Sequence, residues 1–340
     1  MSKVFSLPEE ILRMTFGFVD TLSQLKECRL VCRAWCNPAE VRMLRQEINI
    51  MSENAIFRLY DVLVRNPGKG YLIKHLNFDK CGSFSPVLRE LLYLALTPNI
   101  ETLSGHVNSI EFYTVVNEIV TRSPLKFDRV KTMTSFQYVT IPYFEVLLHF
   151  KNNLETMVFN VDDDDHKTSF ECAKRLVEFK KLTMFSMEGC FSQLWDIDKV
   201  LKYCPNLQNL TIKFHQDDDS LVDQENVKLW TESTVDKQYN LKTLTVNGHC
   251  PADYLEYLFY KYPNIEKIVI DAEVDDEYLD VHFARVKALI EKLHWKQIMF
   301  TVPPHVDFRD LIRNLMNSNY SVIIDNINDN DDIRIKLKGI

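Results

Sequence analysis

The chain has 340 residues, of which 46% are hydrophobic and 26% charged, so it can bury a large core and is globular rather than disordered. Its formal net charge of −8 argues against a general affinity for nucleic acid or anionic membranes, because both need a cationic surface. No stretch approaches the roughly 20 apolar residues that span a bilayer, and the N-terminus lacks the pattern of a secretory signal. We therefore expect an intracellular protein of the cytoplasm or nucleus.

The first fifty residues predict three short helices. The run Ser6–Glu9 has the spacing of a capping box with a proline in the first turn, so the first helix is expected to start at Leu7. Apolar residues then recur at helical spacing up to Val19, and a second helix follows from Leu22. The pair Asn37-Pro38 predicts the start of a third helix. Three helices of this length make a very small core.

Eight cysteines in a chain without a secretion signal are expected to be reduced thiols. Cys28, Cys32 and Cys36 repeat every fourth residue, so we expect them along one side of a helix, packed as small apolar side chains. No histidine or further cysteine completes a zinc site near them, so no metal is expected.

The N-terminal residues resemble a known family. The run LPEEIL, and a leucine-rich helix that ends in RLVCRAW, resemble the F-box, a short helical module. The resemblance covers about residues 4–47 and implies docking onto the Skp-type adaptor of cullin–RING ubiquitin ligases. Thr15 departs from the pattern, since the family more often has an aliphatic residue there. Position by position, the resemblance implies that four adaptor-binding residues face the adaptor, namely Leu7, Pro8, Ile11 and Leu12. It implies that four more complete this docking surface or support it, namely Leu25, Val31, Cys32 and Trp35.

Residues 48–70 are expected to form a helical linker. Ser52 is a candidate cap, and Ile56, Leu59 and Leu63 give the helix one apolar side. Proline and glycine residues over 66–70 then break the helix. We expect this helix to join the N-terminal module to the rest of the chain rather stiffly.

From residue 71 onward one strand motif returns, and each copy is followed by a loop and an amphipathic helical run. Copies beginning at residues 154, 182, 207, 241 and 265 lie between 24 and 34 residues apart, close to the leucine-rich-repeat period of roughly 20 to 29. Such repeats stack into an α/β solenoid, a leucine-rich-repeat horseshoe with a parallel sheet on its concave face and helices outside. The clearest copies are Ile73–Phe78, Leu154–Phe159, Leu182–Met187, Leu207–Ile212, Leu241–Val246 and Ile265–Ile270.

Weaker features extend this pattern. Cys81 and Cys190 fall at the turn position of the repeat and are expected to be structural. A doubly wound α/β sheet would show a similar alternation, but the chain has only eight glycines and no glycine-rich turn between a strand and a helix. Weaker strand copies are expected at Ile100–Gly105, Val130–Phe136, Trp295–Phe300 and Tyr320–Ile324, an edge strand at Ile333–Leu337, and helical runs at 168–180, 192–204, 252–262, 276–293 and 305–317.

No catalytic motif is present among GxSxG, HExxH, P-loop and GxGxxG patterns, so we expect neither an enzyme nor a cofactor. The run Asp162–Asp165 resembles the start of a calcium-binding loop. However, Lys167 stands where such a loop needs glycine, and Ala173 stands where it needs glutamate.

Acidic residues follow three of the predicted strands. In stacked repeats, loops in the same part of each repeat line up along one rim. We expect either an acidic rim that receives a basic segment of a target, or solvated loops and helix caps. The candidate rim consists of Asp162, Asp163, Asp164, Asp165, Asp217, Asp218, Asp219, Asp275 and Asp276.

The whole chain thus resembles F-box proteins with C-terminal leucine-rich repeats, of a fungal type, with an F-box over 1–47, a helical linker over 48–70 and a solenoid over 71–340. The resemblance implies a substrate-recognition subunit of a Skp–cullin–F-box ligase, which binds the adaptor and an unknown target and transfers nothing itself. Two alternatives remain open. One is a non-degradative interaction scaffold whose N-terminal helices only cap the stack, and the other is a hydrolase or transferase on an unrecognised α/β fold.

Overall fold

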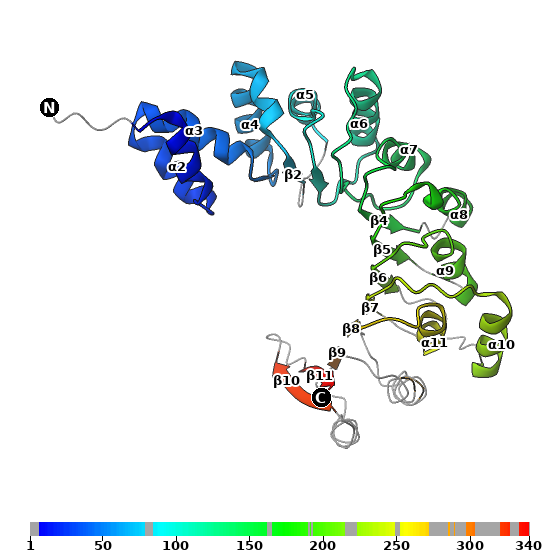
Figure 1. The fold of residues 1–340 in the computed structure, drawn as a ribbon. Helices are drawn as coiled ribbons and strands as arrows, with labels where there is room; N and C mark the ends of the chain where they lie inside the picture. Colours follow the sequence, from blue (N-terminus) through cyan, green and yellow to red (C-terminus); the bar gives the residue numbers. More distant parts are fainter. Residues whose placement is uncertain are drawn as a thin grey trace. The chain divides into compact units, whose positions relative to one another are not determined.

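The structure is a computed structural model that describes residues 7–78, 84–161, 165–189, 191, 193–214, 223–248, 252–271, 285, 289, 297–302, 320–326 and 333–339. The chain divides into two compact units, and Figure 1 labels most of their helices and strands. The first unit comprises Met1–Gln137 and Ile141–Leu154, and the second comprises Tyr138–Thr140 and Glu155–Ile340. None of the described helices combines the length and the hydrophobicity needed to cross a membrane.

The first unit begins with the helices α1 (Glu9–Gly17), α2 (Leu22–Val31) and α3 (Arg33–Leu44). The predicted cap of α2 is confirmed, because the Thr21 hydroxyl accepts a hydrogen bond of 3.3 Å from the backbone N–H of Gln24. Helix α1 starts two residues later than predicted. Pro8 is its N-cap and offers no capping side chain, while Ser6 lies outside the described residues.

Two predictions about the third helix are wrong. Cys32 adopts an extended backbone, with φ −164° and ψ 166°, and separates α2 from α3. Cys28, Cys32 and Cys36 therefore do not share one helix, and Cys32 is exposed. Helix α3 also starts at Arg33, so Pro38 lies inside it rather than in its first turn. Pro38 is buried, and we attribute its tolerance to this packing, which offsets the hydrogen bond that proline cannot donate.

The rest of the first unit alternates short strands with helices, and its three strands form a parallel sheet in the order β1-β2-β3. This sheet begins at Glu47, ahead of the residue 71 at which the repeat was expected to begin. The predicted Ser52 cap is confirmed by a 3.3 Å hydrogen bond from the N–H of Ala55. The elements of this part of the first unit are β1 (Glu47–Asn49), α4 (Glu53–Arg65), the 3-10 helix η1 (Pro67–Leu72), β2 (His75–Asn77), α5 (Pro86–Ala95), β3 (Thr102–Ser104), α6 (Ile110–Arg122) and α7 (Ile141–His149).

The predicted strand over Val130–Phe136 does not form. This segment pairs with its neighbour only at the isolated bridges Thr102↔Thr132 and His106↔Ser135. The hydroxyl of the buried Tyr113 donates a 2.8 Å hydrogen bond to the carbonyl of Ser135. A side chain of α6 therefore anchors the backbone here, in addition to the two bridges.

The second unit contains an eight-stranded sheet in the order β10-β11-β9-β8-β7-β6-β5-β4. Strands β4 to β9 are parallel to one another, whereas β11 is antiparallel to both β9 and β10. The elements are β4 (Thr156–Asn160), α8 (His166–Ala173), the 3-10 helix η2 (Leu176–Glu178), β5 (Met184–Gly189), α9 (Leu194–Leu201), β6 (Asn209–Phe214), α10 (Gln224–Thr234), β7 (Thr243–Gly248), α11 (Ala252–Lys261), β8 (Lys267–Asp271), β9 (Gln297–Val302), β10 (Tyr320–Asn326) and β11 (Ile333–Gly339).

Three details of this sheet differ from the predictions. The strand over Ile333–Leu337 was expected at the edge, but β11 lies inside the sheet and β10 forms the edge. Helix α10 occupies the longest predicted spacing, where no helical run was expected. The sheet is also not parallel throughout, because β11 runs antiparallel to both of its neighbours, β9 and β10.

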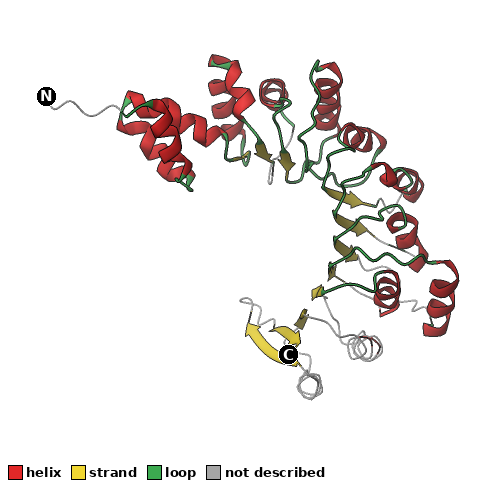
Figure 2. Cartoon of the chain, in the orientation of Figure 1, coloured by secondary structure: helices red, strands yellow, loops and turns green. Residues whose placement is uncertain are grey.

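Alternate residues of each strand from β4 to β8 are buried, and the helices of the second unit lie on one side of its sheet (Figure 2). Met157, Phe185, Leu210, Leu244 and Ile268 are paired in register from strand to strand, and each is at most 2% exposed. The side chains between these positions are only partly covered. The sheet therefore has one apolar face toward the helices and one open polar face.

Candidate docking surface on the N-terminal helices

The three N-terminal helices close around a small apolar core. Leu12, Phe16, Leu25 and Ala39 are each at most 2% exposed. The rings of Phe16 and Trp35 meet edge to face with centroids 5.3 Å apart, and Trp35 is only partly buried. Two of the residues implied to bind the adaptor, Leu12 and Leu25, thus lie inside the core. They position the surface residues rather than present themselves to a partner.

Helix α1 and its flanks carry a second row of apolar side chains that the core does not cover. Leu7 is 46% exposed, Ile11 44%, Met14 65% and Phe18 84%. Their spacing of four, three and four residues is that of one helical side, distinct from the buried Leu12 and Phe16. A helix that packs against a single core needs only one apolar side. Two apolar sides on so short a helix indicate two packing partners.

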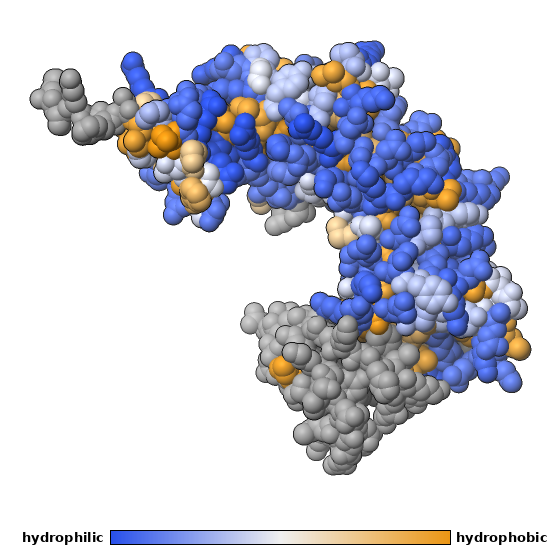
Figure 3. Space-filling model, viewed as in Figure 1, coloured by the Kyte–Doolittle hydropathy of each residue, from blue (hydrophilic) through white to orange (hydrophobic). Residues whose placement is uncertain are grey.

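The end of α2 adds further exposed residues. Leu30 is 78% exposed and Val31 61%, and both Cys32 and Pro8 are exposed. Figure 3 shows hydrophobic side chains at the surface of these N-terminal helices. We call the exposed residues together the N-terminal apolar surface: Leu7, Ile11, Met14, Phe18, Leu30 and Val31.

Sequence reasoning missed Met14, Phe18 and Leu30 as surface candidates. The signal for the first two was present, because they continue the spacing of Leu7 and Ile11 along one helical side. Leu30 had no such signal. It lies five residues after the buried Leu25, which places it about 140° around the axis of α2, on the side away from the core.

Polar contacts fix α3 against its surroundings within the first unit. The Lys69 ammonium on η1 lies 2.8 Å from the Glu40 carboxylate on α3, and both side chains are largely buried. Arg42 donates a 3.2 Å hydrogen bond to the carbonyl of Gly17 at the end of α1. The ion pair joins α3 to η1, the element that precedes β2.

The candidate acidic rim falls mostly outside the described residues, namely Asp162 to Asp164, Asp217 to Asp219, Asp275 and Asp276. The described member, Asp165, caps α8 by accepting a 3.0 Å hydrogen bond from the N–H of Thr168. This interaction with Thr168 lowers the pKa of the exposed Asp165 carboxyl. Asp165 therefore acts as a helix cap, the second of the two expectations. Cys81 and Cys190, most of the run 276–293 and the run 305–317 also lie outside the described residues.

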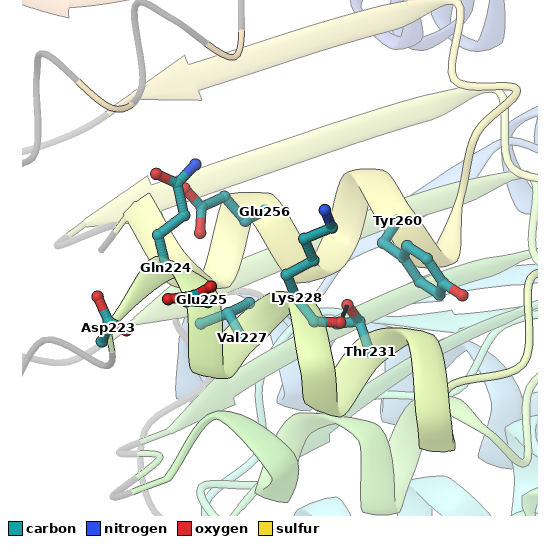
Figure 4. Close-up of a pocket in the computed structure, with 8 residues that line it drawn as sticks. All are labelled: Asp223, Gln224, Glu225, Val227, Lys228, Thr231, Glu256 and Tyr260. Atoms are coloured by element: carbon teal, nitrogen blue, oxygen red, sulfur yellow. Dashed lines mark hydrogen bonds between the residues drawn. The ribbon is translucent and has the colours of Figure 1, made fainter.

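An open hollow of about 590 Å³ lies between α10 and α11 (Figure 4). Glu225, Lys228, Glu256 and Tyr260 line it. Glu256 is held by Arg285 through two hydrogen bonds of 3.2 and 2.7 Å, so this carboxylate is committed to a structural ion pair. Within the part of the chain that the structure describes, no three histidine, cysteine or acidic side chains are placed to hold a metal ion.

Comparison with protein families identifies the N-terminal segment. Residues 4–37 match the F-box domain, which supports an F-box protein. No curated protein matches the chain. F-box domains typically bind a Skp-type adaptor and through it a cullin–RING ligase. The match therefore suggests, in general terms, a protein that connects such a ligase to its substrates. The matched segment contains α1, α2 and the start of α3, and every residue of the N-terminal apolar surface lies within it.

Proposed function

We propose that the protein is the substrate-recognition subunit of a Skp–cullin–F-box ubiquitin ligase, acting in the cytoplasm or nucleus. The F-box docks the adaptor through the N-terminal apolar surface, and the α/β repeats that follow bind the target. The observation that carries the proposal is the second apolar side of α1, which lies within the F-box match and faces away from the core.

Burial of the N-terminal apolar surface by a partner is favourable in free energy. Burying one large aliphatic or aromatic side chain contributes about 1.5 to 3 kcal/mol. Leu7, Ile11, Met14 and Phe18 are all 44% exposed or more, so a partner that covers them gains several such contributions. Contiguous exposed apolar residues of this kind mark protein interaction sites.

The repeats support the second half of the proposal. Consecutive strands are paired in parallel register from β1 to β3 in the first unit and from β4 to β9 in the second, and the strand motif recurs at a period close to that of leucine-rich repeats. We propose a leucine-rich-repeat solenoid on this basis. The protein would not be an enzyme itself. It would supply proximity, by holding a target near the ubiquitin-charged enzyme.

Co-purification with a Skp-type adaptor tests the proposal. The test variant combines Leu7→Ala, Ile11→Ala and Phe18→Ala, which remove exposed side chains only. A matched control combines Leu125→Ala and Ile141→Ala, which are 56% and 58% exposed and lie outside the F-box match.

We expect the wild type and the control to retain the adaptor and the test variant to lose at least about tenfold in affinity, since three anchors are removed. Equal retention by all three proteins would contradict docking through this surface. A wild type that does not bind the adaptor would favour the non-degradative scaffold instead.

A further inference from the structure

The open face of the sheet in the second unit carries a region without charged side chains. Register aligns its residues in two rows that cross β4, β5, β6 and β7. Met184 is 42% exposed and the other members are partly exposed. We call this region the uncharged band: Thr156, Val158, Met184, Ser186, Asn209, Thr211, Thr243 and Thr245.

Two ion pairs border the band. Lys213, one step further along β6, lies 2.6 Å from the Glu188 carboxylate on β5. Lys242, just before β7, lies 2.9 Å from the Glu266 carboxylate before β8. On β8 the first row continues as the exposed Lys267, whereas the second row continues as the partly exposed Val269. Both rows are therefore uncharged only over β4 to β7, which sets the limits of the band.

The chemistry of the band selects against charged ligand groups. A charged side chain placed on it would lose part of its hydration, and the band offers no counter-charge in return. A neutral segment loses less hydration free energy when it is placed on the band. Its peptide groups can exchange hydrogen bonds with the threonine, serine and asparagine side chains, and its apolar groups can contact Val158 and Met184.

The width of the band sets the length of such a segment. Neighbouring strands lie roughly 4.8 Å apart, so β4 and β7 are separated by about 14 Å. An extended chain advances about 3.3 Å per residue. A segment that runs across the strands from β4 to β7 therefore needs four or five residues.

We propose that the uncharged band binds a neutral, extended segment of about five residues in the target. This inference rests on the proposed function, because it takes the repeats to be the part that binds a target. It differs from the acidic-rim hypothesis, in which the target supplies a basic segment.

The experiment selects ligands from a phage-displayed library of random twelve-residue peptides, using the immobilised full chain. The most enriched peptide is then synthesised, and its Kd is measured by fluorescence anisotropy. The band variant combines Thr211→Arg and Thr245→Arg. The control combines Ser233→Arg and Thr234→Arg, which add the same charge at exposed positions of α10. Should the band variant fail to fold by circular dichroism, Ser186→Lys adds a single charge to the same band.

We expect the enriched peptides to have a net charge near zero. The band variant should raise the Kd by at least about tenfold, and the control should leave it within about twofold. Predominantly basic or acidic peptides, no enrichment, or equal binding by the band variant would each overturn the inference. Adaptor co-purification of the same proteins separates this failure from failure of the proposed function, because the band lies outside the F-box match.

Discussion

The Lys261 ammonium lies 2.6 Å from Oδ1 of Asp198, and the lysine side chain is completely buried. The same oxygen accepts a 2.8 Å hydrogen bond from the hydroxyl of Tyr257. The pair links α11 to α9, which are not consecutive along the chain. It therefore ties together two repeats across the helical layer of the second unit.

Removing one partner of this pair should destabilise the second unit. Asp198→Ala leaves a buried ammonium without its counter-charge, for which the expected cost is about 3 to 5 kcal/mol in the free energy of unfolding. Urea unfolding followed by circular dichroism measures it. Lys174→Ala, which removes an exposed ion pair with Glu171, is the control and should leave the free energy of unfolding nearly unchanged, because solvent screens exposed ion pairs. Similar losses for the two variants would show that the buried pair is dispensable.

Two glycines of η1 give a matched test of close packing in the first unit. A Cβ at Gly70 would lie 2.0 Å from the backbone carbonyl oxygen of Leu94, whereas a Cβ at Gly68 would meet nothing within 4 Å. Gly70→Ala is expected to lower stability by about 1 to 3 kcal/mol or more, because α5 must shift to make room. Gly68→Ala is expected to be near neutral. Thermal unfolding of both variants measures this difference. An unchanged Tm for Gly70→Ala would contradict the close packing of Gly70 against Leu94.

Adjacent residues of α1 should separate folding from binding. Ile11 is 44% exposed and Leu12 is 2% exposed. Leu12→Ala is expected to cost about 2 to 5 kcal/mol of stability, because it leaves a cavity in the small core. Ile11→Ala should change stability little and weaken adaptor binding. Thermal unfolding and adaptor titration of both variants measure the two effects. A large loss of stability in Ile11→Ala would place this residue in the core instead.

Cysteine labelling should report the environment of α8. Burial raises the pKa of the Cys172 thiol to about 11, so the thiol stays protonated at pH 8 and becomes the reactive thiolate only as pH rises toward 11. Cys32 is exposed. At pH 8, iodoacetamide should modify Cys172 at least about tenfold more slowly than Cys32, as measured by peptide mass spectrometry. Protein unfolded in urea should lose this difference. Equal rates in the folded protein would indicate that α8 opens readily.

The strands were predictable because their signal is local. Leucine or isoleucine at the first position of each clear motif, such as Leu154 and Leu207, is buried, and the strand itself begins two residues later. The motif therefore identifies the strand and also the turn that precedes it. The docking surface was predictable in part for the same reason, since Leu7 and Ile11 belong to a short motif.

Other features depended on contacts that a local pattern does not report. Ile333–Leu337 has the period-two pattern of a strand whether it pairs at an edge or between two partners, so its place beside β9 was not accessible. The regular spacing of Cys28, Cys32 and Cys36 suggested one helix, but the extended backbone of Cys32 interrupts it. Leu12 matches an adaptor-binding position by motif, while its burial follows from how three helices pack.

The reversed direction of β11 constrains how such a protein can change in length. Between β4 and β9 every strand meets its neighbours in parallel register, so a duplicated strand and helix inserted there would find the pairing it needs on both sides. Beyond β9 the next partner is antiparallel, and a further copy of the repeat would not match it. Gain or loss of repeats by internal duplication or deletion is thus confined to the middle of the sheet, and the β10–β11 hairpin stays at its end.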